Sequence, residues 1–125
     1  MKDSAPVILV VEDDELNLMI ARHILGKGGY EVETAGDGEE AVQKAGARRF
    51  DLILMDIEMP VMDGLEALSL IRQLPGGADM PIIALTAHNI PEKLEEFLAA
   101  GMDGYLIKPF DEVQFAKIAE KYLAA

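Results

Sequence analysis

The sequence lacks cysteine altogether and lacks any long hydrophobic run. Without cysteine there is no disulfide framework and no thiolate metal site, which fits a reducing compartment. The longest unbroken apolar run, VILVV, is far too short to cross a bilayer. The N-terminal MKDSAP has one lysine and no apolar segment behind it, so it does not resemble a signal peptide. These absences predict a cytoplasmic protein, or the cytoplasmic part of a larger one.

Positive charge is also scarce. The chain has 11 Lys and Arg against 23 Asp and Glu, a formal net charge of −12. Binding to DNA depends on cations that meet phosphates, so we expect no direct contact with nucleic acid, and we also expect no membrane contact. Most of the carboxylates are explained as a solvated surface that keeps the protein soluble. Only a few are candidates for a site that gathers a divalent cation.

What the sequence does contain is a regular alternation of strand and helix patterns. Its 125 residues suit a single domain, residues 1–125, with a core that buries roughly two-thirds of the unfolded surface. Segments with helical spacing separate five short strand candidates. The strand candidates are Val7–Val11, Val32–Ala35, Leu52–Met55, Ile82–Leu85 and Gly104–Ile107. This alternation predicts an α/β fold with a parallel sheet and right-handed crossovers.

The ends of the helices and the edges of the sheet also have sequence signals. Helix starts are expected near Asp14, Asp63, Pro91 and Asp111, and helix ends near Gly26, Gly76 and Gly101. The segment LPGGAD, residues 74–79, reads as a flexible loop. The second strand alternates apolar and polar residues, so we place it at an edge of the sheet. After the fifth helix we expect no attached effector domain within these 125 residues.

Polar residues follow four of the five strand candidates. Glu12, Asp13 and Asp14 follow the first strand, and Asp56, Thr86 and Lys108 follow the third, fourth and fifth. Each has an ordinary explanation alone, because aspartates cap helices and lysines lie on surfaces. However, open parallel sheets bind ligands beyond the carboxyl ends of their strands. Together, these residues indicate a site at that edge.

The charges indicate what such a site binds. Two carboxylates about 4 Å apart repel by roughly 4 kcal/mol at an effective dielectric constant near 20, so a converging group needs a cation or a proton. Oxygen ligands suit Mg²⁺, and the absence of nearby histidine or cysteine argues against zinc. Lys108 adds a compact positive charge suited to an oxyanion. In the strand order 2-1-3-4-5, Asp56 is central and can act as a nucleophile that forms an aspartyl phosphate.

Four motifs carry a resemblance to a known family. ILVVEDDELN, DLILMDIEMPVMDG, IIALTA and GYLIKPF resemble the receiver domain of two-component response regulators, from about Val7 to Leu123. The resemblance implies a flavodoxin-like (βα)5 three-layer sandwich. The residues of these motifs are most similar to those in receivers of hybrid sensor histidine kinases or in stand-alone relay receivers.

The resemblance also implies roles for individual residues. It implies that Asp56 accepts a phosphoryl group from a phosphohistidine. By position, the Mg²⁺ ligands are Glu12, Asp13, Asp56 and the main-chain carbonyl of Glu58. Asp14 is expected to cap a helix or to assist. The residues that bind the phosphoryl group or switch with it are Thr86, Ala87, Lys108 and Tyr105. Glu58 and His88 occupy positions that bear on the lifetime of the phosphate.

The implied partner is a sensor histidine kinase or a histidine phosphotransfer domain. Docking is expected through the first helix, where Leu16, Leu18, Met19 and Ile20 supply more apolar surface than one core-facing stripe needs. The output surface comprises the fourth helix, fifth strand and fifth helix. We expect a monomer or a weak phosphorylation-dependent dimer. The domain itself is expected to be a phosphoacceptor and not an enzyme, apart from slow self-dephosphorylation.

Three other readings remain at this point. A haloacid dehalogenase-like Mg²⁺ phosphatase also uses an aspartate nucleophile, but it typically has a second aspartate two residues later, where this chain has Glu58. A flavin-binding flavodoxin-like protein needs a Gly/Ser/Thr-rich phosphate loop, and EDDE would repel the phosphate. A receiver-like module that works without phosphorylation does not need the intact set of Asp13, Asp56, Thr86 and Lys108.

Overall fold

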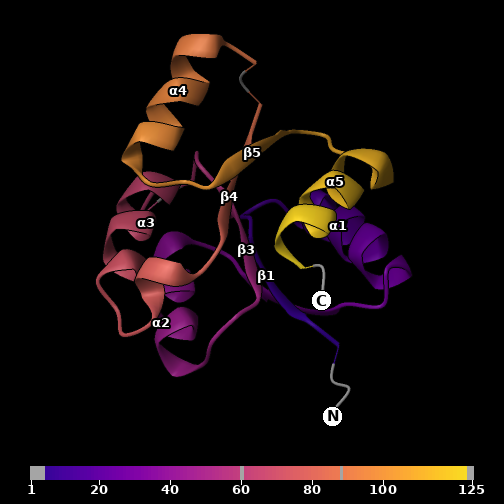
Figure 1. Ribbon diagram of the computed structural model, residues 1–125, viewed down its shortest axis with the longest axis horizontal. Helices are drawn as coiled ribbons and strands as arrows, with labels where there is room; N and C mark the ends of the chain where they lie inside the picture. Colours follow the sequence, from indigo (N-terminus) through magenta and orange to yellow (C-terminus); the bar gives the residue numbers. More distant parts are fainter. Residues whose placement is uncertain (1–4, 60, 88, 124–125) are drawn as a thin grey trace.

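The computed structural model describes residues 5–59, 61–87 and 89–123. Strands and helices alternate along these residues (Figure 1). The strands are β1 Val7–Val11, β2 Glu31–Ala35, β3 Leu52–Asp56, β4 Ile82–Thr86 and β5 Gly104–Ile107. The helices are α1 Glu15–Lys27, α2 Gly38–Ala47, α3 Gly64–Arg72, the 3₁₀ helix η1 Gly77–Asp79, α4 Pro91–Ala100 and α5 Glu112–Tyr122. In these described ranges, no helix is long and apolar enough to cross a membrane.

The strands form one parallel sheet in the order β2-β1-β3-β4-β5, which confirms the predicted order. Helices α1 and α5 cover one face of the sheet and α2, α3 and α4 cover the other (Figure 1). Successive strand residues point to opposite faces: Leu9 packs on the side of α2, α3 and α4, and Val10 packs toward α1 and α5. The sheet is therefore buried between two hydrophobic cores, as in a three-layer sandwich.

The strand boundaries differ slightly from the prediction. Every residue of β1, β3 and β4 is buried, whereas β2 is partly exposed at the edge, as predicted. Strand β2 begins one residue earlier than expected, at Glu31, and strands β3 and β4 each extend one residue further, to Asp56 and Thr86. The reason is pairing, because Asp56 lies opposite Leu85 and Thr86 lies opposite Ile107. Both polar residues are thus held by the sheet itself and not by a loop behind it.

The helix starts follow the predicted caps. The side chains of Asp14, Asp63 and Asp111 accept hydrogen bonds from backbone N–H groups of the first turns of α1, α3 and α5, and Pro91 begins α4. The sequence reading missed Asp37, which caps α2 in the same way.

The helix ends were predicted less well. Gly101, with φ 118°, ends α4 as expected. Gly26 lies one residue before the end of α1 at Lys27, also as expected, although the left-handed residue there is Gly29, with φ 83°. Gly76 is further from a helix end than expected, because α3 ends at Arg72 and Gly76 directly precedes η1.

The segment 74–79 is more ordered in its contacts than the predicted loop. Its last three residues form η1, and Arg72 donates to the carbonyl oxygen of Gly77 at 2.8 Å. A Cβ atom on Gly77 would lie 1.8 Å from the carbonyl oxygen of Ile71, so only glycine fits. The guanidinium of Arg72 also reaches Asp103, 3.0 Å away at the start of β5. Arg72 thus joins α3, η1 and the α4–β5 connection.

Candidate functional site

Three carboxylates meet at the carboxyl edge of the sheet. Glu12 directly follows β1, Asp13 is the next residue, and Asp56 ends the neighbouring strand β3. One carboxylate oxygen from each lies within 4.8 Å of the others. Glu12 and Asp56 are each only 2% exposed, whereas Asp13 is exposed. The structure therefore brings together the acidic residues that the sequence placed at one edge.

Lys108 supplies the positive charge of this site. Its ammonium nitrogen lies 3.2 Å from Asp56 Oδ1 and 3.3 Å from Glu12 Oε1. Its backbone N–H donates to the carbonyl oxygen of Thr86 at 2.8 Å, which ties the residue to the end of β4. The peptide bond between Lys108 and Pro109 is cis. One ammonium against three carboxylates leaves the site with an excess of negative charge.

The electrostatics of the site follow from burial and repulsion. Burial first, and the nearby Asp56 carboxylate second, raise the pKa of Glu12 from 4.5 to about 7, although Lys108 opposes the shift. Burial alone would lower the pKa of Lys108, but the carboxylates of Asp56 and Glu12 raise it above its ordinary value. The lysine therefore stays charged, and one of the buried acids holds its proton unusually tightly.

Backbone N–H groups hold the two buried carboxylates in place. The N–H of Asp14 donates to Glu12 Oε2, and the N–H of Glu58 donates to Asp56 Oδ1, both at 3.2 Å. The side chain of Asp14 itself accepts from the N–H of Asn17, so it caps α1 and stays outside the carboxylate group. This placement bears out the helix-cap reading of Asp14.

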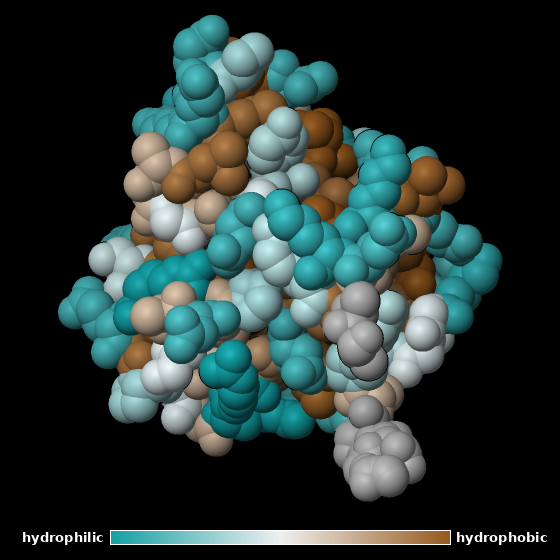
Figure 2. All heavy atoms as spheres, viewed as in Figure 1, coloured by the Kyte–Doolittle hydropathy of each residue, from teal (hydrophilic) through white to brown (hydrophobic). Residues whose placement is uncertain are grey.

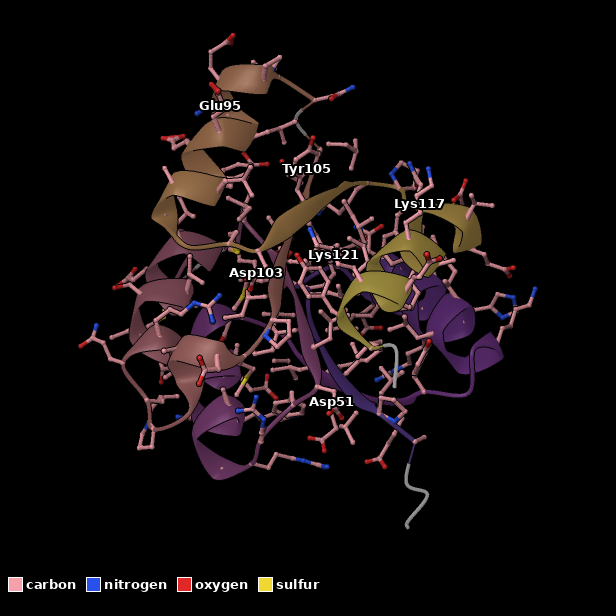
Figure 3. The ribbon with its side chains drawn as sticks, viewed as in Figure 1. Asp51, Glu95, Asp103, Tyr105, Lys117 and Lys121 are labelled. Atoms are coloured by element: carbon pink, nitrogen blue, oxygen red, sulfur yellow. The ribbon has the colours of Figure 1, made fainter. Side chains whose placement is uncertain are left out.

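The remaining predicted residues lie on β4 and β5 or beside them. Thr86 ends β4 and is 1% exposed, and the exposed Ala87 follows it. Tyr105 stands on the edge strand β5 and is 39% exposed (Figure 3). Glu58 is exposed in the β3–α3 connection. His88 lies outside the described residues.

The sequence reading missed the part that Gly64 plays at the site. It was read only as a helix start, yet a Cβ atom there would lie 2.4 Å from the carbonyl oxygen of Asp56. The N–H of Gly64 donates to the carbonyl oxygen of Ile57 at 2.9 Å. A glycine is therefore required for α3 to press against the end of β3. The Asp-Gly pair in MPVMDG is the signal that could have revealed this contact.

The chemistry of the donor atoms fits a hard divalent cation. Carboxylate oxygens are the ligands that Mg²⁺ prefers, usually with water and phosphate oxygens completing the shell. No histidine or cysteine belongs to this group of described residues, so zinc is disfavoured. A cation here would offset the repulsion that raises the pKa of Glu12. The neighbouring Lys108 then remains available for an anion.

Comparisons with known proteins identify the family. The profile of the response regulator receiver domain matches residues 8–120. The signal transduction histidine-protein kinase BarA of Escherichia coli K12 is 41% identical over 118 residues, covering 94% of this chain and 13% of the kinase. The sensor protein GacS of Pseudomonas syringae is 38% identical over 125 residues, covering 98% of this chain and 14% of that protein. The chain thus spans about one-seventh of the length of these relatives.

Solved structures agree with this assignment. The receiver domain of the sensor histidine kinase PA1611 from Pseudomonas aeruginosa, determined with a magnesium ion in its active-site cleft, has a TM-score of 0.90, is 38% identical, and covers 98% of this chain and 100% of that one. The chemotaxis protein CheY4 of Vibrio cholerae has a TM-score of 0.88, is 39% identical, and covers 95% and 99%. The chain belongs to the response regulator receiver domains of two-component systems. The phosphatase alternative is not favoured by these matches.

Proposed function

We propose that the chain accepts a phosphoryl group on Asp56 in an Mg²⁺-dependent reaction, as one receiver domain comprising residues 1–125. The observation that carries this proposal is the convergence of three carboxylates and Lys108 at the end of β3. A carboxylate oxygen of Asp56 attacks the phosphorus of a phosphohistidine, so that a P–O bond forms while the P–N bond breaks. The imidazole leaves and takes up a proton.

The cation would be held by Glu12, Asp13, Asp56 and the main-chain carbonyl of Glu58. When bound, Mg²⁺ neutralises the developing charge and polarises the phosphoryl oxygens. Glu12 and Asp56 are already held by backbone N–H groups, so little reorganisation is needed to present their oxygens. The receiver domain of PA1611, solved with magnesium in its active-site cleft, supports the choice of Mg²⁺ as the cation.

Lys108 and Thr86 would hold the transferred group. In the structure Lys108 pairs with Asp56, and esterification removes the negative charge from that carboxylate. Lys108 then gains a phosphoryl oxygen as its partner, Thr86 donates its hydroxyl to a second oxygen, and the small Ala87 leaves room beside it. These contacts form only after phosphorylation, so the phosphoryl group shifts the domain toward the conformation that makes them.

The output surface would be formed by α4, β5 and α5. Apolar side chains are exposed along it, with Ile90 45%, Leu98 43% and Tyr105 39% exposed. Figure 2 shows hydrophobic residues gathered over the upper part of the molecule, where α4 and β5 lie. Inward movement of Tyr105 together with Thr86 would change this surface, either for a partner or for a weak phosphorylation-dependent dimer.

The partner would be a sensor histidine kinase or a histidine phosphotransfer domain that docks on α1. Leu16, Met19 and Ile20 are 62%, 63% and 38% exposed on this helix, directly after the acidic cluster. Such a partner places the domain in the cytoplasm, where it acts as an acceptor and not as an enzyme. If a hybrid histidine kinase carries it, as the relatives suggest, the catalysis belongs to the other parts of that kinase.

Incubation with acetyl phosphate and Mg²⁺, followed by intact-protein mass spectrometry, tests the acceptor. We expect one added phosphoryl group, none in Asp56→Asn and none with excess EDTA. Asp51→Asn is the matched control, because it makes the same change at the opposite end of β3 and should still be labelled. Lys108→Ala should be labelled poorly, or labelled without a change at the output surface. A phosphoryl group on another residue, or repeated phosphate release from many substrates, would contradict the proposal.

A second variant tests the docking surface. Met19 is exposed and does not belong to the group of Glu12, Asp13 and Asp56, so Met19→Glu should still be labelled by acetyl phosphate. Transfer from a phosphorylated phosphotransfer protein should slow at least about tenfold, because a charge placed in an apolar contact disfavours complex formation. Equal transfer rates for the variant and the wild type would exclude α1 as the docking helix.

A further inference from the structure

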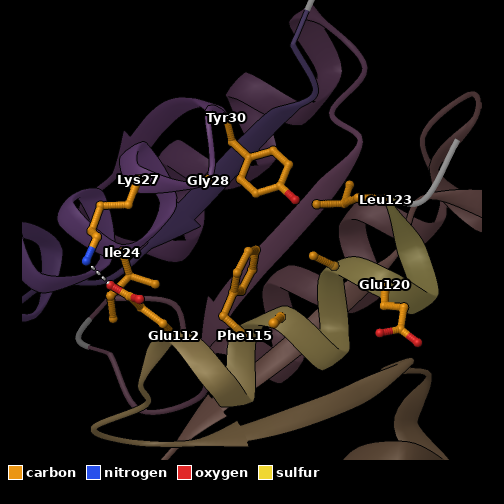
Figure 4. Close-up of a pocket in the computed structure, with 10 residues that line it drawn as sticks. Ile24, Lys27, Gly28, Tyr30, Glu112, Phe115, Glu120 and Leu123 are labelled. Carbon is orange, nitrogen blue, oxygen red and sulfur yellow. Dashed lines mark ion pairs between the residues drawn. The ribbon is translucent and has the colours of Figure 1, made fainter.

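A groove of about 460 Å³ lies between α1 and α5 (Figure 4). Its volume falls within the range of roughly 300–1,000 Å³ that small-molecule sites occupy. None of Glu12, Asp13, Asp56 and Lys108 lines it, so it is distinct from the acceptor site. The groove therefore needs an explanation of its own.

The wall of the groove is apolar and partly aromatic. Its apolar side chains are Ile24, Tyr30, Phe115, Ala116, Ala119 and Leu123. The rings of Tyr30 and Phe115 meet edge to face, with centroids 5.8 Å apart and planes at 77°. A Cβ atom on Gly28 would lie 2.7 Å from a carbon of the Tyr30 ring, so glycine at this position lets the ring lie against the end of α1. Two aromatic rings thus form a fixed apolar surface.

The hollow exists because α5 presents small side chains to it. Ala116 and Ala119 both line the groove, Ala116 is exposed, and a larger side chain at either position would occupy the space. On the same helix, Val113 is 67% exposed and is not part of the lining. A bulky substitution can therefore be placed inside or outside the groove on one helix.

The charges around the groove favour a cation. At one end, Lys27 pairs with Glu112 at 2.5 Å (Figure 4). Glu120 also lines the groove, and no ion pair joins it to any residue within the described ranges. The lining therefore has an excess negative charge in a chain whose net charge is −12.

We propose that this groove binds a small organic cation with an apolar aryl or alkyl body. The body lies against Tyr30 and Phe115, and the cationic group pairs with Glu120. An anion is disfavoured by the two glutamates, and a neutral molecule gains only the apolar contact. This inference does not rest on the proposed phosphoryl transfer.

Three probes of similar size and different charge test the proposal. They are 4-phenylbutylamine, 4-phenylbutan-1-ol and 4-phenylbutyrate, titrated into the ¹⁵N-labelled protein at pH 7 with saturating Mg²⁺, which blocks cation binding at the acidic cluster. We expect saturable shifts of the Tyr30, Phe115 and Ala119 amide resonances with the amine. The alcohol should bind about threefold more weakly, which matches an exposed ion pair, and the carboxylate more weakly still.

Two variants and one control locate the site. Glu120→Gln should bind the amine and the alcohol equally, because only the ion pair is lost. Ala116→Phe should abolish binding by filling the groove, whereas Val113→Phe, a similar change on the same helix outside the lining, should bind like the wild type. Circular dichroism spectra of Ala116→Phe and Val113→Phe report whether these two variants fold.

Several results would overturn the proposal. One is the absence of saturable shifts with the amine. Others are shifts confined to the acidic cluster, and equal binding of the amine by the wild type and Ala116→Phe. Concentration-dependent shifts of the groove residues without any added probe would assign the groove to a second copy of the chain instead.

Discussion

Aspartates occupy both edges of the sheet, and the two edges differ in how many carboxylates share one cation. At the amino edge, Asp51 accepts a hydrogen bond from the N–H of Val7 at 2.8 Å, and Asp103 accepts from the N–H of Ile82 at 2.8 Å while pairing with Arg72 (Figure 3). At the carboxyl edge, the carboxylates of Glu12 and Asp56 crowd together with that of Asp13 around a single lysine. Aspartate therefore stabilises the fold at the amino edge, whereas at the carboxyl edge it is repelled by neighbouring carboxylates.

This difference separates the carboxylates that the fold neutralises from those that we propose to be functional. Asp51 and Asp103 meet backbone N–H groups of strands or a cation that neutralises them, so their charges are satisfied within the fold. The charges of Glu12, Asp13 and Asp56 are compensated only in part, and the raised pKa of Glu12 reflects its burial and the remaining repulsion. Where the fold leaves negative charge uncompensated, a bound ligand can compensate it.

The largest expected effect is on the free energy of unfolding, which equivalent substitutions at the two edges should change in opposite directions. Asp103→Asn removes the charge-assisted contact with Arg72 and should lower the free energy of unfolding by about 2 kcal/mol. Asp56→Asn relieves repulsion with Glu12 and should raise it by about 1 kcal/mol at pH 8 without metal, because Lys108 keeps Glu12 as a partner. Urea denaturation measures both values. Destabilisation by both substitutions would remove the distinction between the two edges.

Magnesium should stabilise the protein only through the carboxyl edge. At a Mg²⁺ concentration ten times its dissociation constant, linkage predicts a gain of about 1.4 kcal/mol in the free energy of unfolding. Asp13→Asn should lose most of this gain, since Asp13 is one of the converging carboxylates, whereas Asp51→Asn should keep it. Thermal denaturation with and without MgCl₂ measures the effect. A full gain in Asp13→Asn would place the cation elsewhere.

The smallest expected effect is the pH dependence of the metal affinity. Because the pKa of Glu12 is about 7, its ionised fraction falls on going from pH 8 to pH 7, and Mg²⁺ should bind about twofold more weakly. Without metal, the raised pKa means that the folded state binds more protons. This group's contribution to stability is therefore fully present below pH 4.5 and is lost as the pH rises through about 7. Calorimetric titration at the two pH values checks the affinity, and an unchanged affinity would show that Glu12 does not act on the metal.

The sequence predicted the sheet and the convergence of Asp13, Asp56 and Lys108 for one physical reason. Continuous apolar runs mark strands that are buried on both faces, and the carboxyl ends of parallel strands meet at one edge. Asp56 and Lys108 are 52 residues apart in the chain, yet their placement after the third and fifth strands was enough to predict their approach. The cap residues Asp14, Asp63 and Asp111 were predictable because capping depends on neighbours in the sequence.

Contacts without a local signal were missed. Arg72 donates to backbone carbonyls of η1 and of Gly101, and any residue in an appropriate position offers a carbonyl. The groove depends on how α1 and α5 lie relative to each other and on two alanines of ordinary appearance. At Gly26, three glycines within four positions offered several possible helix ends, and only the backbone angles showed that Gly29 is the left-handed one.

The contact between Gly64 and the Asp56 backbone matters to anyone who transplants this site into another scaffold. Asp56, the proposed acceptor, and the glycine eight positions later form one unit, because the helix can approach the strand end only where no side chain intervenes. A design that copies the acidic residues and the lysine but places alanine at this position would move the third helix outward. The copied site would then contain the correct residues in an incorrect arrangement.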